Sequence, residues 1–399
     1  MMLPNGWKKV KIKDIESVGI QNGFSPLCVD YETKRKSLSL GSLTGFSLDV
    51  SQQKNISEDA VMPIHSLLKR NDILVSRSNT KDKVGRAAVV LDDLREIYYP
   101  DLMMRFQVNE KNADSQFVAL CLQSPSGRGY FESHAAGTST SMVKINKGVL
   151  ENFSMLLPPI EEQKKIAATL SVWDSAIEKM EKLIEALEER YQSYVNDFFF
   201  ENQNDKQKLK MGDVFAVRND RSVATEDMPL YSLTIENGIT AKTDRYDRGA
   251  LVKDKDSKKY KIVCDGDIVY NPANLRWGAI GQSKVSHNVV VSPIYEVLYT
   301  RDNSNDSRYL SHYIMSKKMI AFYSSKTEGT LIERKEVKID QFLRIDLYIE
   351  KDSVRQKKIA DVLDMHQEEI SNLKQQLENY KKQKQGLMQK LLTGQWRVK

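Results

Sequence analysis

One segment of this chain occurs twice, and both copies have the pattern of a long coiled-coil helix. The residues QKKIA stand at 163–167 and again at 356–360, an offset of 193 positions. Around each copy, apolar residues recur at alternating spacings of four and three over more than four heptads. This 3.5-residue period keeps one seam facing a partner, whereas a lone surface helix would drift at 3.6 residues per turn. The sequence therefore predicts two long helices, each the partner of the other.

The predicted seam is made of the apolar residues at these positions. In the first helix they are Ile166, Leu170, Ile177, Ile184 and Leu187, and in the second Ile359, Leu363, Ile370 and Leu377. Lys384 and His366 also fall on the seam, and we expect these long or polar side chains to reach its edge. Pro158 and Pro159 set the start of the first helix, and Gly394 can end the second. The alternative is that each helix packs separately on its own domain.

The duplication extends into the segments that precede the helices. NDILVSR at 71–77 matches GDIVYNP at 266–272, and DSQFVALCLQS at 114–124 matches DSRYLSHYIMS at 306–316. Short alternating runs of apolar and β-branched residues predict strands with helices between them, which is an α+β fold. We expect a globular domain at 1–157, a helical spacer at 158–204, a second globular domain at 205–350 and a C-terminal helical spacer at 351–399.

Composition sets only loose bounds. The net charge of +6 permits a nucleic-acid partner without requiring one. No run of 18 apolar residues occurs and the N-terminus lacks a signal-peptide pattern, so we expect a cytoplasmic protein without membrane contact. Cys28, Cys121 and Cys264 lie far apart, without metal-ligand spacing, and are expected to be buried thiols.

Enzymatic motifs are missing or incomplete. Neither GxxxxGK[ST] nor GxGxxG occurs, which excludes the usual nucleotide-binding loops. NPAN at 271–274 lacks the second proline and the aromatic residue of an adenine methyltransferase motif, so no ring is available to stack a flipped base. Glu333 and Lys335 have nuclease-like spacing but no convincing acidic partner. We predict no catalytic residues and no metal site.

The whole arrangement resembles the DNA-specificity subunit of type I restriction-modification enzymes, the HsdS family. The resemblance is carried by LPPIEEQKKIA and RQKKIADVLD entering the two helices, by the ending LMQKLLTG, and by NDI and GDI in the two halves. It implies two pseudo-twofold-related target-recognition domains separated by two long antiparallel coiled-coil helices. LYIEKDSVRQ departs from the family pattern by lacking the prolines and the Glu-Gln pair of LPPIEEQ.

The resemblance also implies a non-catalytic role in host defence and DNA methylation. Each domain would read one half of a bipartite asymmetric site in double-stranded DNA, and the helices would set the spacing and dock two methyltransferase (M) subunits. Two motor-nuclease (R) subunits would complete the complex. S-adenosylmethionine, ATP and magnesium would bind those partners, and this chain would bind no cofactor.

Two polar surfaces in each half are the candidates for contact with DNA. Arg and Asn suit base edges, and Lys neutralises phosphate. The first surface comprises Arg77, Asn79, Lys81, Lys83 and Arg86 in one half and Asn271, Asn274, Arg276 and Trp277 in the other. The second comprises Ser139, Thr140 and Lys144, with Lys326, Thr330, Arg334 and Lys335.

Other interpretations stay open. Each candidate loop could be a simple solvated turn. A coiled-coil scaffold that never touches DNA would explain the helices, although not two similar domains with Arg- and Asn-bearing loops at matching places. The specificity half of an enzyme whose methyltransferase is normally fused would also lack catalytic motifs.

Overall fold

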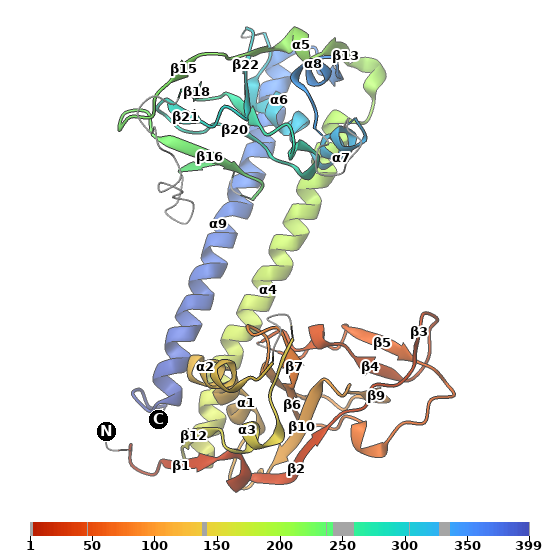
Figure 1. Ribbon diagram of the computed structural model, residues 1–399, viewed down its shortest axis with the longest axis vertical. Coiled ribbons are helices and arrows are strands. Elements are labelled where there is room, and N and C mark those ends of the chain that lie inside the picture. Colours follow the sequence, from red (N-terminus) through yellow and green to blue (C-terminus); the bar gives the residue numbers. More distant parts are fainter. Residues whose placement is uncertain are drawn as a thin grey trace. The chain divides into compact units, whose positions relative to one another are not determined.

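The computed structural model describes residues 3–45, 47–137, 142–236, 238–241, 259–302, 304–326 and 336–398. These residues form two compact α+β units (Figure 1). The first comprises Met1–Lys182 with Lys374–Lys399, and the second comprises Leu183–Leu373. Two long helices, α4 (Ile160–Phe199) and α9 (Ser353–Leu392), each contribute to both units. Each unit is described below by itself.

The first unit is built on a four-stranded antiparallel sheet of order β2-β10-β6-β8. A second sheet has the order β3-β5-β4-β9, and β1-β12 and β11-β7 form two-stranded ribbons. The strands are β1 (Lys8–Lys11), β2 (Glu16–Asn22), β3 (Cys28–Val29), β4 (Lys36–Leu38), β5 (Gln53–Ile56), β6 (Ile73–Ser76), β7 (Ser78–Asn79), β8 (Ala87–Val89), β9 (Ile97–Tyr98), β10 (Met103–Val108), β11 (Val143–Lys144) and β12 (Ser154–Leu157). Its shorter helices are α1 (Ser115–Gln123), α2 (Pro125–His134) and α3 (Lys147–Glu151).

The second unit repeats this plan. Its four-stranded sheet has the order β14-β22-β19-β20, and β13-β23 forms a ribbon as β1-β12 does in the first unit. The strands are β13 (Gln207–Lys210), β14 (Phe215–Val217), β15 (Arg221–Ser222), β16 (Leu230–Thr234), β17 (Gly238–Ala241), β18 (Tyr260–Val263), β19 (Ile268–Tyr270), β20 (Ile280–Gln282), β21 (Val289–Val291), β22 (Glu296–Thr300) and β23 (Asp346–Ile349). The helices are α5 (Met211–Val214), α6 (Ser307–Ile314), α7 (Lys317–Ser325) and α8 (Ile339–Leu343). The units diverge in the remaining sheet, which among the described residues of the second unit has five strands in the order β15-β18-β21-β16-β17.

The long helices pack against each other within each unit and run antiparallel. In the first unit, Glu162, Asp174 and Glu181 of α4 contact Arg397, Lys384 and Lys381 in that order, so the partner's number falls as that of α4 rises. In the second unit, Tyr191 contacts Gln367, and Tyr194 contacts His366 with 5.1 Å between ring centroids. The ends of both helices also enter the domain cores, with Ile166 and Leu391 in the first unit and Phe199 and Leu363 in the second. All nine seam residues are buried: Ile166, Leu170, Ile177, Ile184, Leu187, Ile359, Leu363, Ile370 and Leu377.

The NDI and GDI segments form the same turn in the two units. Asn71 and Gly266 both have positive φ, 66° and 79°, a conformation that glycine adopts freely and asparagine tolerates better than most residues. The next residue, Asp72 or Asp267, accepts a backbone N–H at 2.7 and 2.8 Å from Lys69 or Cys264. Each carboxylate also binds an arginine, Arg105 or Arg218. The change from Gly to Asn therefore leaves the turn unchanged.

The glutamine of QKKIA has the same role in both units. The Oε1 atom of Gln163 accepts the N–H of Asp114 at 2.8 Å, and its Nε2 donates to the carbonyl of Pro158 at 2.7 Å. Gln356 accepts the N–H of Asp306 at 2.9 Å and donates to the carbonyl of Glu350 at 2.7 Å. Asp114 and Asp306 are the N-caps of α1 and α6, so each glutamine joins a long helix to the first helix of its unit.

Two expectations from the sequence are wrong in detail. Lys384 does not reach the edge of the seam, because its residue surface is only 2% exposed and its amino group pairs with Asp174. Cys28 is exposed and Cys264 is partly buried, so only Cys121 is a fully enclosed thiol. Burial raises the pKa of Cys121 far above its ordinary value, which makes this thiol unreactive.

Candidate nucleic-acid interface

In the first unit, the loop between β7 and β8 forms a tight turn that presents two lysines. The N–H groups of Lys83 and Val84 both donate to the carbonyl of Thr80 at 2.9 Å. Gly85 has a φ of +73°, and a Cβ atom there would lie 2.4 Å from the Phe131 ring, so only glycine fits. Lys81 and Lys83 are exposed on this turn. The turn is thus fixed by its backbone hydrogen bonds and by packing against Phe131, while its two lysines face solvent.

A short ribbon brings the two predicted surfaces of the first unit together. β11 pairs with β7, with Val143 opposite Asn79 and Lys144 opposite Ser78. The N–H of Ile145 also donates to the carbonyl of Arg77 at 2.9 Å. Lys144 is exposed, and Arg77 and Asn79 are half-buried. These residues lie some 65 positions apart in sequence but adjoin in the structure.

The two predicted arginines of this surface already have protein partners. The guanidinium of Arg86 donates to the carbonyl of Thr44 at 3.0 Å, and that of Arg77 donates to the carbonyl of Asp101 at 3.3 Å. Each bond uses one nitrogen of a group with five donors, so further contacts remain possible. Arg86 is held against the 44–45 turn, and the lysines are the more accessible cations.

The corresponding loop of the second unit is also a built turn. The carboxamide oxygen of Asn271 accepts the N–H of Ala273 at 3.1 Å, and the N–H of Trp277 donates to the carbonyl of Asn274 at 2.9 Å. Asn274 is exposed, and Trp277 is 61% exposed with the Arg276 guanidinium 5.0 Å from its ring centroid. An exposed indole beside an arginine offers an apolar face and positive charge at one place.

The loops of the two units are fixed to the following segment in the same way. The N–H of Val337 donates to the carbonyl of Pro272 at 3.0 Å, as Ile145 does to Arg77 in the first unit. Lys326 is exposed at the end of α7, with its amino group 5.3 Å from the Phe322 ring centroid. Ser139, Thr140, Thr330, Arg334 and Lys335 lie outside the described residues.

Residues that the sequence did not single out position these loops. Arg128 of α2 donates to the carbonyls of Val84 and Asp82 at 2.6 and 3.0 Å and so anchors the lysine-bearing turn. A hydrogen bond from Thr80, with the charges of Lys83 and Arg86, holds the pKa of Asp82 below its ordinary value. The local sequence does not mark Arg128 for this role, because the two carbonyls that it binds lie 44 and 46 positions away.

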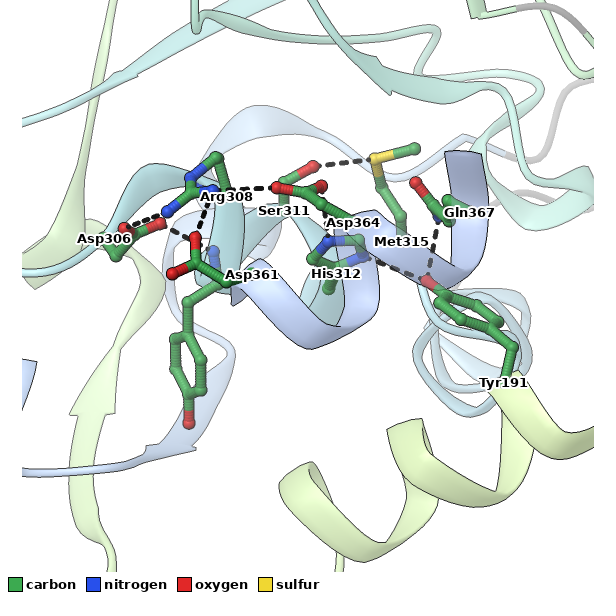
Figure 2. Close-up of polar contacts among 10 residues, drawn as sticks. Tyr191, Asp306, Arg308, Ser311, His312, Met315, Asp361, Asp364 and Gln367 are labelled. Carbon is green, nitrogen blue, oxygen red and sulfur yellow. Dashed lines mark hydrogen bonds and ion pairs between the residues drawn. The ribbon is translucent and has the colours of Figure 1, made fainter. Parts of the chain in front are cut away.

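A polar cluster in the second unit joins α4, α6 and α9 (Figure 2). The hydroxyl of Tyr191 lies 3.0 Å from Nδ1 of His312, and Nε2 of His312 lies 3.0 Å from Asp364. The amide of Gln367 donates to the Tyr191 hydroxyl at 2.9 Å. Arg308 extends the cluster to Asp306, Asp361 and Asp364 at 3.2, 2.8 and 3.0 Å.

This cluster, here called the helix clamp, holds α4, α6 and α9 together by hydrogen bonds and ion pairs. Burial raises the pKa of Tyr191 to about 12, so the phenol stays protonated while it is hydrogen-bonded to Nδ1 of His312. His312 then donates from Nε2 to Asp364, and this hydrogen bond lowers the pKa of the carboxyl group. A Tyr-His-Asp chain that ends in a phenol of raised pKa does not supply an activated nucleophile.

The described residues offer neither a metal-binding cluster nor a membrane-spanning helix. Within the ranges that the structure describes, no group of three or more His, Cys, Asp or Glu side chains is placed to hold a metal ion. Among the same residues, no helix combines the length and apolar character needed to cross a bilayer.

The chain is similar in sequence to DNA specificity subunits of type I restriction enzymes. Residues 4–189 match the family model described as the type I restriction modification DNA specificity domain. The chain is 26% identical over 199 residues to the EcoEI specificity subunit of Escherichia coli, covering 48% of this chain and 32% of that subunit. It is 23% identical over 331 residues to the MjaVIII specificity subunit of Methanocaldococcus jannaschii, covering 74% of each chain. The matched part thus spans about a third of the length of the E. coli relative.

Solved structures share the fold across nearly the whole chain. The S subunit of a type I restriction-modification system from M. genitalium has a TM-score of 0.62 at 16% identity, covering 98% of both chains. A chain from a structural study of complex assembly in the type I R-M system has a TM-score of 0.55 at 12% identity, covering 98% of this chain and 99% of that one. Residues 4–189 thus match a type I restriction-modification DNA specificity domain, and the chain shares its fold with a solved S subunit over nearly its whole length.

Proposed function

We propose that this chain is the DNA-recognition subunit of a type I restriction-modification complex, in which each unit reads one half of a bipartite, asymmetric site. The observation that carries the proposal is the repeated mounting of two different loops. Each loop follows the equivalent strand of its four-stranded sheet, β6 or β19. Each is also held by a matching backbone hydrogen bond, from Ile145 to Arg77 in the first unit and from Val337 to Pro272 in the second. One presents Lys81 and Lys83, and the other presents Asn274 and Trp277. Equivalent frames with different exposed groups suit two half-sites of different sequence.

The chain itself does no chemistry in this proposal. The paired helices set the separation of the two half-sites and dock two methyltransferase subunits, and two motor-nuclease subunits complete the assembly. S-adenosylmethionine, ATP and magnesium act in those partners. The polar cluster around His312 supports this division, because its terminal phenol is kept protonated.

The first test is to co-express the chain with the methyltransferase subunit of its own restriction-modification system and to map N6-methyladenine across the host genome. We expect a two-part asymmetric motif with a fixed gap. Methylation that is absent, or the same without this chain, in a complex shown to assemble would favour a coiled-coil scaffold instead.

A pair of variants then tests the assignment of loops to half-sites. Asn79→Ala should relax sequence preference in one half of the motif, and Asn274→Ala in the other, each by about 1–3 kcal/mol per lost base contact. Gln376→Leu, an exposed change on α9, is the matched control. An equal loss in both halves from either asparagine variant would contradict separate reading units.

A further inference from the structure

A partly buried ion pair connects the long helices in the first unit. The amino group of Lys384 in α9 pairs with the carboxylate of Asp174 in α4, and the two side chains are 3% and 27% exposed. Burial raises the pKa of Asp174, while the charge of Lys384 acts against this shift. An ion pair removed from water is tolerated only while each charge has its partner.

The equivalent place in the second unit holds an uncharged pair. The QKKIA offset of 193 makes Lys384 the counterpart of Tyr191, and Gln367 the counterpart of Asp174. These counterparts also meet, since the amide of Gln367 donates to the Tyr191 hydroxyl at 2.9 Å. The two cross-helix contacts are therefore copies of one contact in a duplicated fold, one charged and the other neutral.

The duplication creates a competing way to pair the helices. Because α4 and α9 share a pattern, α4 could pair with α4 of a second copy in the same antiparallel register, and α9 with α9. In the first case Asp174 would face Tyr191, and in the second Lys384 would face Gln367. Self-pairing would place the partly buried Asp174, or the buried Lys384, opposite a neutral group, so only α4 with α9 satisfies both charges.

Charges at the rim of the seam act in the same direction. Glu181 of α4 pairs with Lys381 of α9 at 2.9 Å. Their counterparts at the 193-residue offset are Lys374 and Glu188. Self-pairing would therefore place Glu181 opposite Glu188 and Lys381 opposite Lys374. Residues 174–190 carry six acids and three bases, whereas 374–390 carry five lysines and one glutamate, so the two stretches attract each other and each repels its own copy.

We propose that the Asp174–Lys384 pair, supported by the rim charges, selects pairing of α4 with α9 and prevents self-pairing of either helix with a second copy of this chain. The partner that it rejects is thus another molecule of the same protein. The selection does not depend on DNA recognition, so it can hold or fail independently of the proposed function.

Three forms of the full-length chain test the proposal: wild type, the neutral double variant Asp174→Leu/Lys384→Leu, and the charge-exchanged double variant Asp174→Lys/Lys384→Asp. Chains with two different tags are co-expressed, and mixed dimers are measured by tandem capture and sedimentation under reducing conditions, because Cys28 is exposed. The neutral variant should associate with itself at least about tenfold more strongly than wild type. The charge-exchanged variant should behave as wild type does.

Cross-linking identifies which helices pair in any dimer. The centre of an α4 self-pair falls near residue 183 and that of an α9 self-pair near 376, so a lysine-reactive reagent should join Lys182 to Lys182, and Lys374 to Lys374, between differently labelled copies. Circular dichroism reports whether each variant is folded. A folded neutral variant that stays as monomeric as wild type, or dimers that lack both cross-links, would overturn the proposal.

Discussion

Two buried glutamines fix the long helices to the globular parts of the fold. Gln163 and Gln356 are 0% and 1% exposed, and each joins a long helix to the N-cap residue of a neighbouring helix. Leucine would fill the same volume but would leave a buried N–H and a buried carbonyl without partners. Such groups cost about 1–3 kcal/mol each when they lose a partner.

We therefore predict that Gln356→Leu destabilises the second unit by about 2–4 kcal/mol. The change should lower the urea midpoint of that unit and speed amide hydrogen exchange at the start of α6. Gln163→Leu should do the same at α1. The exposed Gln376→Leu should change stability by less than about 0.5 kcal/mol. Unchanged exchange at α6 in the Gln356 variant would show that the amide contacts carry little energy.

Asn71 offers a second prediction at this scale. Its φ of 66° is strained for most side chains, and its counterpart in the second unit is Gly266. Asn71→Ala should cost about 1–2 kcal/mol, whereas Asn71→Gly should be nearly neutral. Chemical unfolding of the three proteins measures the difference. Equal losses for alanine and glycine would point to the asparagine side chain and not to its backbone conformation.

At the scale of elements, the sequence predicted the two long helices and the α+β frame because both depend on local periodicity and on the repeat. It could not predict the contacts that lock these elements, since their partners are distant. Asp114 lies 49 positions from Gln163, and Asp174 lies 210 from Lys384. The sequence could not predict the partner of Arg86 for the same reason, because its guanidinium donates to a carbonyl 42 residues earlier. The turn at 80–85, by contrast, carries its lysines in a local sequence that marks them as exposed.

The helix clamp should make the stability of the second unit depend on pH. The hydrogen bond from His312 holds the pKa of Asp364 below its ordinary value. A carboxyl with a lowered folded-state pKa contributes stability that is complete above the unfolded value of about 3.9 and is lost as the pH falls through the folded pKa. We predict that Asp364→Asn is less stable than wild type at pH 6 and that the difference shrinks below about pH 4. Urea unfolding at several pH values measures it, and a constant difference would contradict the role of the charge.

For the whole molecule, duplication provides two similar frames while the exposed groups differ. The order of the main sheet, the NDI and GDI turns and the contacts of Gln163 and Gln356 repeat, whereas the second sheet has four strands in one unit and five in the other, counted over the described residues. A chain built in this way can change the exposed groups of one unit without disturbing the other unit. Duplication also makes each long helix resemble its partner, so that either helix could pair with its own copy in a second chain. The charges on the seam are proposed to prevent this self-pairing.

The salt dependence of DNA binding by the assembled complex tests the role of the two lysines on the 80–85 turn. If Lys81 and Lys83 contact phosphates, replacing both with glutamine removes two released counterions, so the slope of log K against log salt should fall by about 1.8. The loss should be the same for any base sequence, because phosphate contacts carry no sequence information. Lys8→Gln/Lys9→Gln is the matched control, since these two lysines are also exposed in the first unit and the change in net charge is identical. Binding measured between 50 and 200 mM salt separates the outcomes. A smaller slope for the Lys81 and Lys83 variant alone places DNA at this turn, whereas equal slopes for both variants would mean that the turn acts only through net charge.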